Sequence, residues 1–146
     1  MFAALVAIEA FPDNVDSAGI GVFLDGMARC RGWQEPVSRH GSPVEVLGPV
    51  WSVAPVRRDI FDDLGGLDES FYLYLEDLDF ALRARWRGHR CLFSPQLRAA
   101  HEKSSTAGKH TAQKAYHVER NHVWVALRCF PAPLLALAPF YTLYRY

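Results

Sequence analysis

The segment Glu76–Arg87 constrains the fold most, because its apolar side chains recur at the spacing of one helix face. Acidic side chains occupy its first turn and arginines its last, which suits the charge distribution of a helix dipole. Asp79 and Arg83 stand in a favourable i,i+4 pair, and Gly88 predicts the end of the helix. The apolar face consists of Leu75, Leu78, Leu82 and Trp86.

Short strand-like segments and further helices flank this helix, so we expect an α/β fold with a small mixed sheet and two main helices. The sequence divides into an irregular strand and loop segment over residues 1–47, a dense region over 48–128 and an apolar tail over 129–146. The expected strands are Ile20–Leu24, Val44–Leu47, Val50–Val56, Arg90–Phe93 (ended by Ser94-Pro95) and Leu97–Ala100. The other expected helices are Arg57–Leu64 and Thr111–Phe130.

Composition excludes several classes of protein. A length of 146 residues suffices for one compact domain, and 50% apolar side chains argue against intrinsic disorder. The 16 basic and 16 acidic side chains balance, so we expect no nucleic-acid partner. Cys30, Cys91 and Cys129 fit neither a disulfide framework nor a C-x-x-C metal site, which favours a reducing compartment.

The tail is the most apolar part of the chain. Cys129–Tyr144 holds three prolines, and it falls short of the ~18–20 uninterrupted apolar residues that a membrane-spanning helix needs. Two interpretations stay open, namely a segment that lies against a membrane surface and a tail that packs on the core.

The acidic cluster at the start of the predicted helix has two interpretations. Glu76, Asp77 and Asp79 complement the helix dipole, which explains most such clusters. They also follow directly on the aromatic run Phe71–Leu75, which we expect to be buried. A carboxylate at the edge of an apolar pocket is suited to take a proton from a substrate hydroxyl.

Two further groups of polar residues are candidates for binding. His101 follows a strand-like segment, where it is either a hydrogen-bonded structural residue or, with nearby carboxylates, part of a site for Mn²⁺ or Mg²⁺ with a diphosphate. The adjacent Arg57 and Arg58 either pair with phosphate or carboxylate or lie on a solvated helix face. Arg120-Asn121 has a polar helix face as its plainest interpretation.

Together these residues resemble the acceptor half of family 2 glycosyltransferases. Residues 48–58 (GPVWSVAPVRR) are similar to the segment that opens this half. Residues 64–83 (LGGLDESFYLYLEDLDFALR) resemble the family signature GGFDE-x-F-F-x-Y-x-EDVDL-x-x-R. The resemblance is specific from about residue 48 to 122, looser over residues 16–32, and strongest to the rhamnosyltransferase-like branch. In the family's order and spacing there follow Gly88-His89-Arg90, Ser94-Pro95, His101 and Arg120-Asn121.

The resemblance implies a partial GT-A fold and an inverting transfer of a sugar from a nucleotide-sugar donor to a polysaccharide or lipid-linked acceptor. It implies that Asp77 or Glu76 is the general base and leaves the choice open. It also implies a divalent cation, Mn²⁺ or Mg²⁺, with His101 as a ligand, and a cytoplasmic site at the inner face of a membrane. The substrate-binding residues that it implies are Arg57, Arg58, Asp68, Glu69, Asp79 and Arg120.

Two departures from the family pattern bear on this expectation. Leu67 stands where the family usually has Phe, which keeps an apolar side chain. The sole Asp-x-Asp, Asp77-Leu78-Asp79, belongs to the acceptor-side motif and not to a donor site. We therefore expect a fragment without the donor-binding half, joined through residues 1–47, inactive by itself and with exposed sheet edges. The alternative is a non-catalytic remnant or partner module that keeps the acceptor scaffold.

Overall fold

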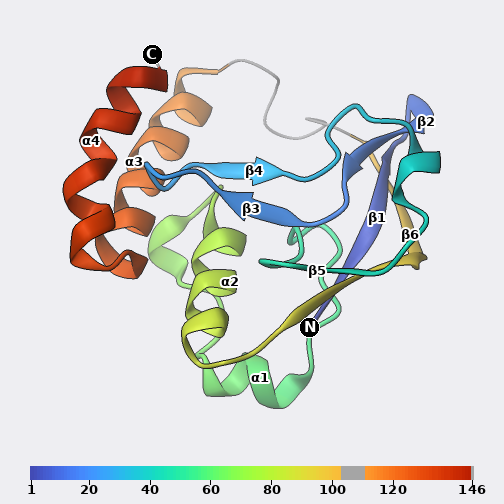
Figure 1. The fold of residues 1–146 in the computed structure, drawn as a ribbon, viewed down its shortest axis with the longest axis horizontal. Coiled ribbons are helices and arrows are strands. Elements are labelled where there is room, and N and C mark those ends of the chain that lie inside the picture. The colour runs from blue at the N-terminus through green and yellow to red at the C-terminus, as the bar shows by residue number, and fades with distance from the viewer. Residues whose placement is uncertain (103–110, 146) are drawn as a thin grey trace.

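The computed structural model describes residues 1–102 and 111–145, which form an α/β fold (Figure 1). Its strands are β1 (Phe2–Ile8), β2 (Phe11–Ser17), β3 (Ile20–Val22), β4 (Ala28–Cys30), β5 (Val44–Val46) and β6 (Cys91–His101). The larger sheet has the order β2-β1-β6-β5, and β3 pairs with β4 in a second sheet. Because β1 and β6 are parallel while β2 and β5 pair antiparallel with their neighbours, the larger sheet is mixed, as expected.

β1 lies at the centre of the larger sheet because its side chains are apolar on both faces. The run from Ala3 to Val6 is at most 2% exposed, which is typical of a strand covered on both sides. The parallel pairing ends with Ile8 opposite His101, so the carboxyl ends of β1 and β6 lie together. Polar side chains at this edge are therefore candidates for ligand binding.

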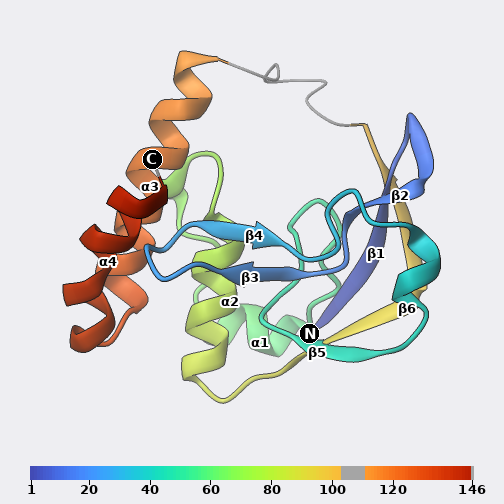
Figure 2. The ribbon, with the colours of Figure 1, turned by 45° about the horizontal axis from the view of Figure 1, so that its top comes forward.

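The helices gather on one side of the sheets. They are α1 (Arg58–Asp63), α2 (Glu76–Trp86), α3 (Ala112–Cys129) and α4 (Ala132–Arg145), with short 3-10 turns η1 (Val37–His40) and η2 (Glu69–Phe71). In both views α3 and α4 lie side by side at one end of the molecule, and α2 lies between α3 and the larger sheet (Figures 1 and 2). The Arg145 guanidinium anchors α4 through a 2.6 Å hydrogen bond to Asp25 in the β3–β4 turn.

Two apolar clusters meet at α2. On one side Phe80 packs with the larger sheet and with Trp51, whose ring centroid is 4.9 Å away. On the other side Leu78 and Leu82 pack with Val125 of α3. Since both sides of α2 are covered, its position in the molecule is fixed by the core.

The sequence predictions for the first third of the chain were partly wrong. Residues 1–47, expected to be irregular, contain β1 to β5. The predicted strand Val50–Val56 is instead a turn and an extended segment, in which the Val53 N–H donates to the Val50 carbonyl over 3.2 Å. The strands expected over Ile20–Leu24 and Val44–Leu47 are confirmed as β3 and β5. β1 was not expected, because a strand buried on both faces shows no alternation, and β4 has only three residues.

Two predictions near α2 were also wrong in detail. Strand β6 does not end at Ser94-Pro95, because a register shift between Ala4 and Leu5 of β1 accommodates Pro95, which has no N–H to donate. Trp86 was expected on the buried face but is 64% exposed, and its indole Nε1 donates to the Cys129 carbonyl over 2.8 Å.

The predicted helices are confirmed, with α1, α2 and α3 within two residues of their expected bounds. The apolar tail forms a helix of its own, α4, so the described part of the chain has three long helices instead of two main ones. In residues 1–102 and 111–145, no helix has the length and apolar character to cross a membrane.

Candidate functional site

The five residues before α2, which we call the approach loop (residues 71–75), have a strained backbone. Tyr72, Tyr74 and Leu75 have positive φ angles of 61°, 70° and 68°, which non-glycine residues rarely adopt. At Tyr72 ψ is −62°, and the Leu73 N–H donates to the Phe71 carbonyl over 2.7 Å, which makes the rarer and strained kind of γ-turn. Such strain persists only where neighbouring structure holds the backbone in place.

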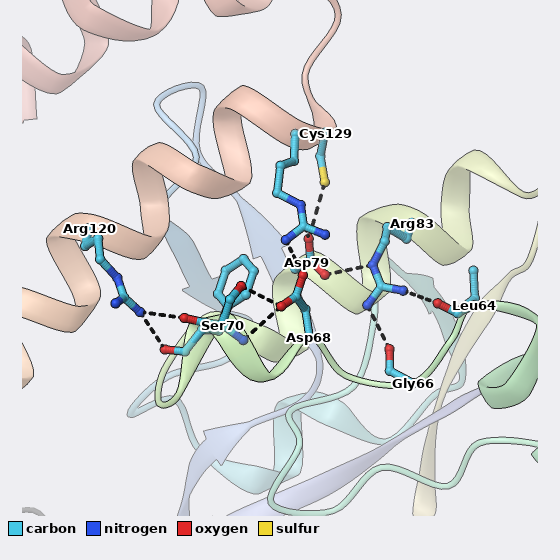
Figure 3. Close-up of polar contacts among 10 residues, drawn as sticks. Leu64, Gly66, Asp68, Ser70, Asp79, Arg83, Arg120 and Cys129 are labelled. Carbon is cyan, nitrogen blue, oxygen red and sulfur yellow. Dashed lines mark hydrogen bonds and ion pairs between the residues drawn. The ribbon is translucent and has the colours of Figure 1, made fainter.

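Two adjacent residues of α3 hold the approach loop. The buried Asn121 donates from Nδ2 to three of its carbonyl oxygens, those of Phe71, Leu73 and Tyr74, at 3.0, 2.8 and 2.7 Å. Arg120 donates over 2.9 Å to the Ser70 and Phe71 carbonyls (Figure 3) and to the side-chain oxygen of Asn121. Arg120 therefore donates both to the backbone and to Asn121, and its expected place among the substrate-binding residues stays a prediction.

The first turn of α2 places two partly buried carboxylates next to each other. Asp77 accepts hydrogen bonds from the backbone N–H groups of Leu78, at 2.8 Å, and of Trp51. Burial and the adjacent Glu76 charge raise the pKa of Asp77 from 3.8 to about 6. Burial also raises the pKa of Glu76, whose Oε2 atom is buried without a hydrogen-bond partner in the described part of the chain. Carboxyl groups perturbed in this way are typical of sites for proton transfer.

Asp79, two residues further on, faces the core. Its side chain is fully buried, and its carboxylate lies 2.7 Å from Arg83 Nε, 3.7 Å from Arg128 Nε and 3.8 Å from Cys129 Sγ (Figure 3). Arg83 also donates to the Leu64 carbonyl over 2.6 Å and to the Gly66 carbonyl over 2.9 Å. The predicted Asp79–Arg83 pair is confirmed, and the burial of Asp79 leaves it no surface for a substrate.

Asp68 and Glu69 begin the turn η2. The Asp68 side chain accepts from the Ser70 N–H over 2.9 Å and forms an ion pair with Arg128 (Figure 3). Hydrogen bonds from Ser70 and Arg128 lower the pKa of Asp68 from 3.8 to about 2. Glu69 is exposed. Asp68 therefore joins the start of η2 to α3, and its place among substrate-binding residues stays a prediction.

The two adjacent arginines pair with carboxylates close in sequence. Arg57 binds Asp59, and Arg58 binds Asp62 across one turn of α1 with Nε–Oδ2 at 2.8 Å. All four side chains are at least 54% exposed. Neither arginine forms an ion pair with Glu76 or Asp77 in the described part of the chain. In this structure both arginines lie on a solvated helix face, as one of the two interpretations expects.

His101 lies at the carboxyl edge of the sheet. Its Nδ1 is 2.8 Å from the Asp16 carboxylate, which comes from the end of β2. No cluster of three or more His, Cys, Asp or Glu side chains suited to hold a metal occurs among residues 1–102 and 111–145. Asp16 was not singled out by sequence reasoning, although it opens the looser stretch of resemblance at residues 16–32.

Comparison with known proteins gives distant relatives. The chain is 31% identical over 131 residues to proteins named "N-acetylglucosaminyl-diphospho-decaprenol L-rhamnosyltransferase" from two strains of Mycobacterium tuberculosis. It is 29% identical over 104 residues to an O-antigen biosynthesis protein of Myxococcus xanthus. The matches cover 71% and 66% of this chain, respectively. The mycobacterial relatives are thus named as rhamnosyltransferases.

The relatives are considerably longer than the matched region. The chain spans 43% of the length of the mycobacterial proteins and 8% of the myxobacterial one. No family model matches the sequence. The activity, substrates and partners of a whole enzyme are therefore matters for proposal.

Proposed function

We propose that the chain forms the acceptor side of an inverting, family 2 glycosyltransferase of GT-A type, with Asp77 as the general base. The observation that carries this proposal is the Asp77 carboxylate, fixed by two backbone N–H groups and with its pKa raised to about 6. Such a pKa leaves the group mainly ionised near neutral pH, and more basic than an ordinary aspartate. The similarity to a named rhamnosyltransferase supports the same reaction class.

The proposed reaction is a single displacement. The oxygen of an acceptor hydroxyl attacks the anomeric carbon of a nucleotide-sugar, and the bond to the diphosphate breaks with its electron pair. The hydroxyl proton passes to the Asp77 carboxylate. Burial and the charge of Glu76 keep Asp77 basic, and Asn121 fixes the approach loop that leads into the first turn of α2, which carries the base. A base held in position lowers the entropic cost of the transition state.

The proposal includes a divalent cation, Mn²⁺ or Mg²⁺, with His101 as one of its ligands. When Asp16 accepts the Nδ1–H of His101, Nε2 keeps its lone pair, which is the tautomer of a metal-ligating histidine with a supporting carboxylate. The described residues thus fit one protein ligand, with the oxygens of a diphosphate and water completing the coordination. Such a cation offsets the charge of a departing diphosphate.

The names of the relatives support the class of acceptor that we propose, and the exposed side chains of α4 support a location at a membrane surface. The mycobacterial relatives are named for an N-acetylglucosaminyl-diphospho-decaprenol substrate. We extend this to a nucleotide-sugar donor and a glycan or lipid-linked acceptor for the present chain. α4 exposes an apolar face that fits contact with the cytoplasmic side of a membrane; this face comprises Leu137, Phe140, Leu143 and Tyr144.

Transfer and binding assays test this proposal. The chain is titrated with dTDP and UDP, each with and without Mn²⁺, and, together with the amino-terminal half of a related enzyme, it is assayed for rhamnose transfer to a lipid-linked N-acetylglucosamine acceptor. We expect Asp77→Asn to lower transfer by roughly 10²–10⁴-fold with unchanged nucleotide binding. Asp62→Asn, an exposed carboxylate of α1, is the matched control and keeps both properties. Transfer at the normal rate by Asp77→Asn contradicts the assignment.

A non-catalytic partner module is the second candidate, favoured by the 43% coverage of the mycobacterial relatives. It predicts glycan binding without transfer, even after the amino-terminal half of a related enzyme is added. Transfer that depends on Asp77, by the chain alone or by the complemented pair, contradicts this second candidate.

A further inference from the structure

Two exposed tyrosine rings flank the half-buried ring of His117 where the approach loop meets α3. Tyr72 is 68% exposed, and its ring centroid lies 5.2 Å from that of His117 with an interplanar angle of 38°. Tyr116 is 61% exposed, and its ring lies 5.3 Å from that of His117 at 72°. We call Tyr72, Tyr116 and His117 the aromatic platform.

The backbone at Tyr72 is strained, although the Tyr72 side chain itself is not packed in the core. Its γ-turn sends Phe71 into the core, where that side chain is fully buried, and Tyr72 into solvent. Glycine adopts a positive φ freely, whereas a bulky side chain there is strained. A tyrosine that is both strained and exposed indicates that its ring has a use at the surface.

Neighbouring cations cover two other tyrosines but leave Tyr72 open. Lys114 Nζ lies 5.5 Å from the Tyr74 ring centroid, and the Arg120 guanidinium lies 5.7 Å from that of Tyr116. In the part of the chain that the structure describes, the ring of Tyr72 contacts His117 and no cation lies over it. The same part offers no hydrogen-bond partner to the buried His117 Nδ1. The platform thus offers an open ring face at Tyr72.

We propose that the aromatic platform binds the pyranose ring of the acceptor sugar by stacking, an inference that rests on the proposed function. The C–H bonds on the apolar face of a pyranose meet the negative face of an aromatic ring, while its hydroxyls hydrogen-bond at the ring edges. The approach loop leads from Tyr72 directly to Glu76 and Asp77. Stacking on the platform therefore holds the acceptor on the chain segment that also positions the base.

Ligand binding observed by NMR tests the platform without any need for turnover. The methyl β-glycoside of N-acetylglucosamine is titrated into the chain, and the His117 imidazole signals report contact. Loss of one stacked ring is expected to weaken binding by roughly ten-fold in Tyr72→Ala. Tyr72→Phe keeps the ring and stays within about two-fold of the unsubstituted chain. Tyr144→Ala, which removes a 90% exposed tyrosine from α4, is the matched control and binds normally.

Comparison of Tyr72→Gly with Tyr72→Ala separates the effect of the ring from that of the backbone strain. The alanine removes only the ring, whereas the glycine removes the ring and folds with a relaxed γ-turn. Weakened binding in Tyr72→Gly and Tyr72→Ala alike supports the platform. Glycoside binding at full strength in either folded variant overturns it, as does the lack of any binding by the unsubstituted chain. Glycoside binding without sugar transfer, in the presence of the amino-terminal half of a related enzyme, contradicts the proposed function alone. Transfer with an acceptor KM that is unchanged in Tyr72→Ala contradicts the platform alone.

Discussion

Asp77→Asn is expected to make the protein more stable at pH 8 while it removes the proposed base. The native pKa of about 6 exceeds the ordinary value of 3.8, so the folded state binds more protons than the unfolded state between these values. Stability from this group is therefore lost as the pH rises from 3.8 to 6 and stays lost above. Such a shift corresponds to about 2–3 kcal/mol after allowance for partial exposure.

The asparagine removes this loss, because it carries no charge and its side-chain oxygen still accepts from the Leu78 N–H. Urea denaturation at a series of pH values gives the free energy of unfolding of both proteins. We expect the advantage of Asp77→Asn to be near zero at pH 4 and to grow to about 2–3 kcal/mol above pH 7. A difference that is constant with pH, or an advantage that shrinks as the pH rises, refutes the argument.

Asp68→Asn is the control of opposite sign. The native pKa of Asp68, about 2, lies below 3.8, so its carboxylate stabilises the fold above that pH and the effect is lost on acidification. The variant is therefore expected to be less stable than the unsubstituted chain near neutral pH and equal to it near pH 2. Parallel pH profiles for Asp68→Asn and Asp77→Asn contradict the assigned environments.

Further predictions concern the supports of the site. Asn121→Ala removes the Nδ2 donor from three carbonyls of the approach loop and is expected to lower the free energy of unfolding by about 2–4 kcal/mol; a loss below that of the exposed Arg58→Ala contradicts its role. Gly26→Ala, at φ +89° with a Cβ 2.5 Å from the His122 carbonyl oxygen, should cost more than about 1 kcal/mol in thermal denaturation, whereas the open position Gly21→Ala costs less. Asp16→Asn should weaken Mn²⁺-dependent nucleotide binding by about 10–100-fold, and unchanged calorimetric affinity argues against a metal-ligating His101.

The parts of the fold that depend on local sequence could be predicted, and those that depend on distant contacts could not. α2, its dipole charges and the Asp79–Arg83 pair follow from spacing within one helix. The hold of Asn121 on the approach loop joins residues about 50 positions apart, and the pairing of Asp16 with His101 spans 85. Nothing in the local sequence around Asn121 or Asp16 shows which distant residue it contacts, so neither contact could be predicted.

Charge type alone does not show which groups a side chain pairs with. Arg57 and Arg58 matched the chemistry of a phosphate site, yet each has a carboxylate within its own short helix, at Asp59 and Asp62. An ion pair between residues close in sequence forms at a lower entropic cost than one between distant residues. An arginine with an acidic neighbour in sequence therefore tends to pair with it. The sequence indicates which charged side chains are candidates for a site, and the folded structure determines which of them lie in contact.

Asp77 and Asp79 show how the fold gives different roles to identical side chains two residues apart. At about 100° per residue they project from nearly opposite sides of α2. Asp79 points into the core, where Arg83 and Arg128 compensate its charge, so it ties the helix to its surroundings. Asp77 is desolvated beside Glu76, and no arginine or lysine of the described residues pairs with it, so its carboxylate keeps a high affinity for a proton. The same burial that stabilises a compensated carboxylate makes an uncompensated one a base.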